Sequence, residues 1–275
     1  MNSAYVYQIY YNEETKQQIQ PGFIPLDNTN NLRPDWFEFW VILNFLRNNK
    51  LEEDSWYGFF SPKFTAKTGF SSFEVDRIIS TSPSETDIFL FSPAWDQICY
   101  FQNSWEQGDA WHPGLKDISQ EIFNKCNIEF DISKSVGHTK NTVYSNYFLA
   151  KKSFWTEWQS MAEIIFNYLE CEEGKKYSNL KTPYAHPLKQ YPIKTFIQER
   201  IVNILLSKNK YTTIASCKME EIPIFEKLFS NTKENKILLQ ACNLLKILYT
   251  QTNSLNHQKT FWQLQKLINY SQPYA

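Results

Sequence analysis

An acid and a base stand side by side in an otherwise apolar segment of this chain. The segment is TFIQERIVNILL, residues 195–206, and the pair is Glu199 and Arg200. In a helix, Glu199 borders an apolar strip and is expected to be partly buried, whereas Arg200 falls in a narrow polar wedge. A buried carboxylate costs free energy unless it is paired or hydrogen-bonded. The pair therefore fits either the wall of a ligand site or a structural ion-pair network, and spacing alone leaves both open.

Other acid–base candidates follow a predicted buried strand. Asp96 comes just after that strand, where α/β folds place ligands, although it could instead begin a helix. His112 lies in a loop bounded by Gly and Pro, with Trp105 and Trp111 beside it. Those rings suit the apolar face of a sugar, or they simply anchor the loop. The candidates for a general base are Glu199, Asp96 and His112.

Two polar segments could bind a charged ligand. Lys63 and Lys67 follow a predicted strand, where they could neutralise a diphosphate or simply be solvated at the surface. Asp27 and Asn28 belong to the loop DNTNNLRPDW, residues 27–36. That loop either covers a ligand or supplies ordinary turn and capping groups.

The elements that must position these residues alternate between strands and helices. Hydrophobic periodicity and capping residues predict strands at 4–11, 55–61, 87–93 and 142–150, and helices at 33–49, 71–80, 95–105, 115–126 and 152–170. This order predicts an α/β sheet domain. From Lys194 onward only helices are predicted, at 195–206, 219–229, 233–250 and 259–269. We therefore expect a sheet domain over 1–208 and a helical extension over 209–275 packed on it.

Composition narrows the class of protein. The chain has 275 residues, 42% hydrophobic and 17% aromatic, with a net charge of −1, so no global basic surface for nucleic acid is expected. The five cysteines form no CxxC, and the four histidines lack metal-ligand spacing, so no metal ligand is assigned. No leader or apolar run long enough to span a membrane is visible. We expect a cytoplasmic protein, and peripheral contact with the inner membrane stays open.

Four segments, taken in order, resemble bacterial surface-polysaccharide glycosyltransferases with a GT-A-like α/β fold. They are DWFEFWVILNFL, WYGFFSPKF, SNYFLAKKSFWTEW and FIQERIVNILL. The resemblance covers about residues 5–208. The resemblance implies a mixed, Rossmann-related sheet flanked by helices. It also favours a ligand-site role for Glu199. The chain departs from the family where Lys63 follows Ser61-Pro62 in place of arginines, and no DxD pair is present to bind a divalent ion.

The resemblance implies transfer of a sugar from a nucleotide-sugar donor to a glycan or lipid-linked glycan acceptor, in making lipopolysaccharide or capsule. A divalent cation, Mn²⁺ or Mg²⁺, stays open as a cofactor. The residues expected to hold the donor are Tyr11, Asn12, Asp27, Asn28, Lys63, Lys67 and Arg200. The alternative is a non-catalytic carbohydrate-binding or scaffold protein of a polysaccharide assembly complex, which the aromatic content fits equally well.

Overall fold

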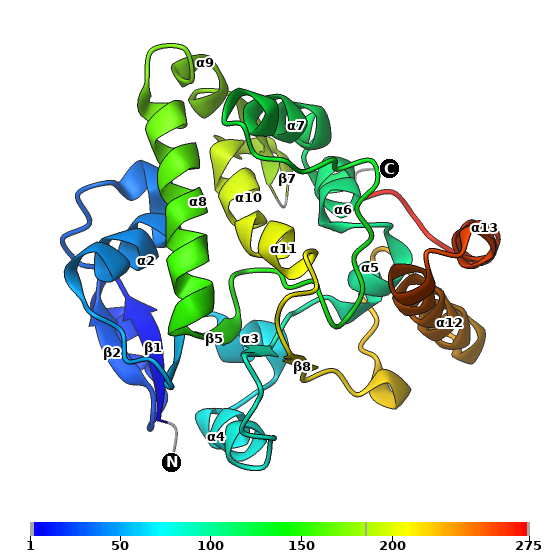
Figure 1. Cartoon of the computed structure of the whole chain (residues 1–275), viewed down its shortest axis with the longest axis horizontal. Coiled ribbons are helices and arrows are strands. Elements are labelled where there is room, and N and C mark those ends of the chain that lie inside the picture. Colours follow the sequence, from blue (N-terminus) through cyan, green and yellow to red (C-terminus); the bar gives the residue numbers. More distant parts are fainter. Residues whose placement is uncertain (1–2, 185, 274–275) are drawn as a thin grey trace.

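A computed structural model describes residues 3–184 and 186–273 of the chain. These residues form a six-stranded mixed sheet with helices packed around it, in the strand order β2-β1-β3-β5-β4-β8 (Figure 1). The strands are β1 (Ala4–Tyr10), β2 (Ile24–Asp27), β3 (Trp56–Phe60), β4 (Ile88–Leu90), β5 (Phe148–Lys151) and β8 (Thr213–Ala215). The predicted α/β class is confirmed.

The directions of the strands bring several strand ends together at one edge of the sheet, which we call the functional edge. β1 pairs in parallel with both β2 and β3, so the carboxyl ends of these three strands meet at one edge. β5 runs antiparallel to β3 and β4, so its amino end lies at that same edge. The chain passes from β1 to its neighbour on one side and then returns to the neighbour on the other. This reversal is a topological switch point, where open α/β sheets bind ligands.

Side chains of the sheet alternate between two apolar cores. In β3, Tyr57 and Phe59 join the larger core, whereas Trp56 and Phe60 join the smaller one. The helices that contribute to the larger core include α2 (Phe37–Asn48), α8 (Lys152–Glu170), α10 (Lys194–Gln198) and α11 (Ile201–Leu206). The smaller core is covered by α3 (Phe64–Thr68) and α4 (Ser72–Ser80). Burial of both faces fixes the sheet between two helical layers.

The remaining elements surround this sheet. The short helices are α1 (Glu13–Gln17), α9 (Lys175–Ser178), and the 3₁₀ turns η1 (Pro34–Trp36) and η2 (Met219–Glu221). Beyond the sheet lie α5 (Trp95–Tyr100), α6 (Ser104–Trp111), α7 (Leu115–Lys125), α12 (Lys233–Thr252) and α13 (Leu255–Gln265). A separate hairpin, β6 (Lys181–Tyr184) and β7 (His186–Pro192), precedes α10 (Figure 1).

Local capping explains where several helices begin. The predicted start of α4 is confirmed, because Ser71 and Glu74 form a reciprocal capping box. The single helix predicted at 95–105 is instead two helices. The side chain of Asn103 accepts hydrogen bonds from the backbone of Trp105 and Glu106, which begins α6 anew.

Three other predicted elements differ from the structure. The strand at 142–150 starts only at Phe148, because Ser145 and Asn146 have left-handed backbone with φ of 60° and 55°. The helix at 219–229 is wrong, since only the turn η2 forms before Pro223, a residue that cannot continue a hydrogen-bonded helix. The purely helical expectation after Lys194 is also wrong, because β8 pairs with β4 and extends the sheet.

The C-terminal helices pack beside the sheet domain. α12 contacts α5 and α13, and the buried ammonium of Lys246 donates to the carbonyls of Ile98 and Phe101 at the end of α5. The apolar side chains of α12 are not all buried in this packing, since Ile237 and Leu244 are open to solvent. The boundary at residue 208 stays a prediction.

Candidate functional site

A pocket of about 570 Å³ lies at the functional edge of the sheet. Three of its lining residues come directly after the parallel strands: Tyr11 follows β1, Asn28 follows β2, and Ser61 follows β3. Ser145 and Asn146, just before β5, complete this side. We call the residues from the strand ends and α3 the sheet-edge wall. Because each stands where its strand ends, the sheet itself determines their proximity.

Two lysines supply the positive charge of the sheet-edge wall. Lys63 lies just before α3 and Lys67 lies within it, and both line the pocket. Lys67 Nζ donates to Ser145 Oγ at 3.0 Å. Among the described residues, the Lys63 ammonium has no hydrogen bond or ion pair. The two ammonium groups are therefore placed to bind an anion such as a diphosphate.

Two carboxylates also line the pocket. Glu199 stands between α10 and α11, and Glu38 stands in the first turn of α2. Neither has a hydrogen bond or ion pair within the part of the chain that the structure describes. Burial raises the pKa of Glu38 to about 7; the charge of Lys67 opposes this shift, and that of Glu199 adds to it. A carboxyl group with such a pKa can exchange a proton near neutral pH.

An aromatic hairpin contributes to the pocket as well. Tyr184 of β6 and Tyr191 of β7 line the pocket with Phe37. The Tyr191 ring lies 5.1 Å from Tyr184 and 5.7 Å from Phe37, measured between centroids. We call these rings, with Glu38, Glu199 and the α10 residues that line the pocket (Thr195, Phe196 and Gln198), the hairpin wall. The pocket thus has one basic, polar wall and one aromatic, acidic wall.

The segment TFIQERIVNILL is not one continuous helix. α10 ends at Gln198 and α11 begins at Ile201, so the acid and base occupy the break. This break turns the two side chains to different environments. Glu199 lines the pocket, whereas Arg200 is only 4% exposed and lies in the protein interior. Glu199 thus has the position that the ligand-site interpretation expects, whereas Arg200 bonds neutral acceptors and not an ion-pair partner.

Arg200 has three structural acceptors and does not line the pocket. Its guanidinium donates to the carbonyls of Ser104 and Phe196 at 2.8 and 2.7 Å, and to Gln107 Oε1 at 2.8 Å. It also lies so close to Gly108 that a methyl group there would be 2.7 Å from its terminal nitrogen. Arg200 therefore holds α6 against α10 and α11.

Asp96 and His112 also lie outside the pocket lining. Asp96 accepts hydrogen bonds from the backbone of Gln97 and Phe225, while burial raises its pKa to about 6. His112 Nδ1 donates to the Pro183 carbonyl at 2.8 Å, and its ring stacks on Phe196. Burial, aided by the charge of Arg200, lowers the pKa of His112 to about 3. The contacts of both side chains are structural, and His112 holds strand β6 of the hairpin through the Pro183 carbonyl.

Asn12 and Asp27 flank the pocket without lining it. Asn12 caps α1 by accepting from the Thr15 backbone at 2.8 Å. Asp27 accepts from the backbone and hydroxyl of Thr29, and these bonds lower its pKa. The turn chemistry weighed for the loop 27–36 accounts for Asp27, and helix capping, which was not foreseen at this position, accounts for Asn12. Trp105, expected to flank a sugar loop, is buried against Phe130.

Of the ten predicted site residues, the pocket brings together Tyr11, Asn28, Lys63, Lys67 and Glu199. Sequence reasoning missed Glu38 and the hairpin tyrosines. Glu38 had a detectable signal, since it is the acidic residue inside the apolar run DWFEFWVILNFL. Tyr184 and Tyr191 had none, because the hairpin was not predicted and nothing in the sequence places it over the sheet edge.

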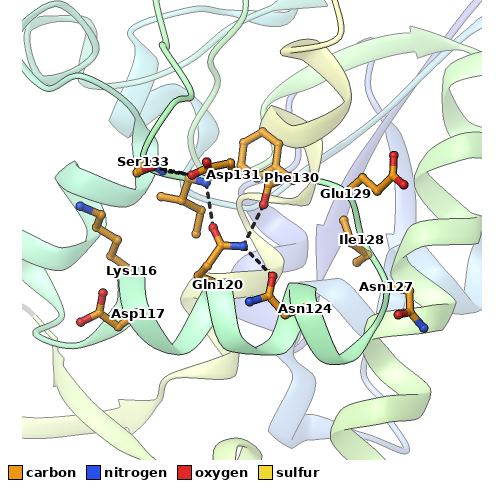
Figure 2. Close-up of a pocket in the computed structure, with 11 residues that line it drawn as sticks. Lys116, Asp117, Gln120, Asn124, Asn127, Ile128, Glu129, Phe130, Asp131 and Ser133 are labelled. Carbon is orange, nitrogen blue, oxygen red and sulfur yellow. Dashed lines mark hydrogen bonds between the residues drawn. The ribbon is translucent and has the colours of Figure 1, made fainter.

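A second hollow lies between α7 and the segment 127–133. Gln120 spans it by donating to the Phe130 carbonyl and accepting from the Ile132 backbone, while Asp131 accepts from Ser133 (Figure 2). These bonds pair the polar groups with one another. None of the predicted site residues lines this hollow, so we place the candidate site at the sheet edge.

The described residues include neither a cluster of metal-ligating side chains nor a membrane-spanning helix. Within residues 3–184 and 186–273, no group of three or more His, Cys, Asp or Glu could hold a metal ion. We therefore derive no step through the Mn²⁺ or Mg²⁺ that the resemblance left open. No described helix has the length and apolar character needed to cross a membrane.

Comparisons of the chain with protein-family models, curated proteins and solved structures found no match.

Proposed function

We propose that this protein is a glycosyltransferase that moves a sugar from a nucleotide-sugar donor to a glycan acceptor in bacterial surface-polysaccharide synthesis. One observation supports this function most: a single pocket at the sheet's switch point combines Lys63 and Lys67 with Glu38 and Glu199. Positive charge stabilises a departing diphosphate, and a carboxylate accepts a proton. The mixed α/β sheet agrees with the GT-A-like resemblance.

The donor would lie along the sheet-edge wall. Tyr11 is exposed beside Asn28 at the ends of adjacent strands, a position suited to a nucleobase or ribose. The diphosphate would then contact Lys63 and Lys67. These ammonium groups would offset the charge that develops as the nucleoside diphosphate leaves.

The chemical step joins an acceptor oxygen to the anomeric carbon while the bond from that carbon to the diphosphate oxygen breaks. In an inverting reaction, Glu38 or Glu199 takes the acceptor hydroxyl proton, and the diphosphate leaves with the bonding electron pair. A retaining reaction needs no such base. The acceptor class in this proposal is a glycan or a lipid-linked glycan.

A ligand screen tests the proposal. Nucleotide sugars are screened by thermal shift with and without Mn²⁺, and each stabilising donor is then assayed for hydrolysis and transfer. We expect at least one donor to raise the melting temperature and to be turned over. The Lys63→Met/Lys67→Met variant should lose that stabilisation. Glycan binding without any nucleotide-sugar binding would contradict the proposal and support a non-catalytic carbohydrate-binding protein.

A further inference from the structure

The hairpin wall has a ligand chemistry of its own. Phe37 and Tyr184 remain 38% and 36% exposed, although their rings lie beside others that could cover them. Phe37 also has a φ of 47°, which is unfavourable for a bulky residue. Backbone strain of this kind persists only where the surrounding structure imposes it. The strained backbone presents an aromatic ring to the pocket.

Unpaired oxygen atoms accompany the rings. Gln198 lines the pocket and is only 3% exposed, yet its Oε1 has no hydrogen-bond partner among the described residues. Its Nε2 donates to the Trp36 carbonyl at 3.2 Å, which fixes Oε1 as the free acceptor. The hydroxyl of Thr195, another lining residue, is also buried without a partner among those residues. A buried unpaired acceptor is costly, so a donor from a ligand would offset this cost.

The hairpin wall and the sheet-edge wall differ in the charged residues that belong to them. Its lining residues include the carboxylates of Glu38 and Glu199 and, within the described chain, no lysine or arginine. Lys189 lies over the Tyr191 ring but does not line the pocket. This wall itself, within the described chain, holds no cation to bind a phosphate, although the charges of Lys67 and Lys63 reach Glu38. A neutral ring with several hydroxyl donors suits both the amide oxygen and the carboxylates, and its C–H face suits the aromatic rings.

We propose that the hairpin wall is the acceptor subsite and that it binds a pyranose ring, stacked on Tyr184 or Tyr191, with a hydroxyl donated to Gln198 Oε1. This inference rests on the proposed function, because that function assigns the sheet-edge wall to the nucleotide. The subsite places an acceptor hydroxyl beside the two carboxylates that could take its proton. The predicted ligand class is thus a neutral hexose or a glycan ending in one.

The test uses methyl hexosides as acceptors, with UDP and GDP as probes of the other wall. Tyr184→Ala, Tyr191→Ala and Gln198→Leu should each raise the acceptor KM about tenfold. The Kd for the nucleoside diphosphate should change less than about twofold. Tyr191→Phe keeps the ring and should stay close to the parent. Lys181→Ala, an exposed change on the same hairpin, serves as the neutral control.

The other possible results distinguish failure of the acceptor subsite from failure of the glycosyltransferase proposal. An unchanged acceptor KM in all three variants overturns the subsite, as does an equal loss of nucleoside diphosphate affinity. If the full-length protein binds a hexoside through these residues but binds no nucleotide sugar, the sugar subsite stands and the glycosyltransferase proposal fails. Circular dichroism and thermal melting of each variant distinguish loss of binding from loss of fold.

Discussion

Glu38 and Glu199 line the same pocket, and the negative charge of Glu199 contributes to the raised pKa of Glu38. Burial of the Glu38 carboxyl is the largest cause of the shift to about 7, and the charges of Lys67 and Lys63 oppose it. The two acids come from α2 and from the junction of α10 with α11, so only packing of these helices makes them neighbours. Carboxyl groups with interacting charges are common where enzymes transfer protons.

The pH dependence of turnover tests Glu38. If Glu38 takes the acceptor proton, it must be ionised, so kcat/KM should rise with pH through an inflection near 7. Glu38→Gln should lower kcat/KM by a factor of about 10² to 10⁴ and remove the inflection. A retained inflection in Glu38→Gln would show that another group titrates.

The same residue predicts a change in stability with pH. The folded state keeps the Glu38 proton up to about pH 7, whereas an unfolded glutamate releases it near the ordinary glutamate pKa of 4.5. Between these values the folded state binds more protons, so this group's contribution to the free energy of unfolding falls as pH rises. Glu38→Gln should therefore gain stability over the parent above pH 7 and gain little at pH 4.5. Urea unfolding at both pH values measures this difference.

Glu199→Gln separates the roles of the two carboxylates. If Glu199 is the base, turnover should fall by a factor of about 10² or more while the fold stays intact. If Glu199 only modulates Glu38, turnover should persist and its inflection should move below pH 7, because a charge that raises the Glu38 pKa is gone. Near-normal turnover with an unmoved inflection would contradict both roles.

The lysines should control binding of the leaving group. Lys63→Met and Lys67→Met should each weaken binding of the nucleoside diphosphate by about tenfold, most strongly at low salt. Each change also removes a charge that lowers the Glu38 pKa, so the inflection of kcat/KM should move above pH 7. Lys50→Met, an exposed lysine outside the pocket lining, is a matched control. Isothermal titration at two salt concentrations checks the prediction.

Arg200 should matter for stability. Arg200→Met removes the donor of three buried hydrogen bonds. The Ser104 carbonyl keeps its partner within α6, but the Phe196 carbonyl and Gln107 Oε1 lose theirs, and each unsatisfied acceptor costs about 1–3 kcal/mol. We expect a loss of at least about 2 kcal/mol in the free energy of unfolding, measured by urea titration. Gly108→Ala should also destabilise the protein, since its new methyl group would displace the guanidinium. A stable Arg200→Met variant that lost only nucleotide binding would contradict this structural assignment.

Much of the fold was predictable because its signals are local. Short runs of aromatic and β-branched residues identified β1, β3 and β4, and the capping pair Ser71–Glu74 identified α4. The prediction failed where short-range patterns compete. Asn103 begins a new helix inside an apolar run, and β8 is a three-residue strand that exists because β4 offers it a partner. Such a strand has too few residues to show a period of its own.

The sequence by itself determined the α/β class and placed Tyr11, Lys63 and Lys67 at or just after predicted strands, because residues next to a parallel strand inherit their place from the sheet. Asn28 was expected in a loop, and the unpredicted strand β2 brings it to the sheet edge. Only the tertiary structure decided the environments of the Glu199 and Arg200 side chains. Helical periodicity assigns faces, but it cannot tell which face meets a pocket and which meets buried carbonyls. The break between α10 and α11, and the hairpin folded beside it, place the acid at the site and the base in the interior.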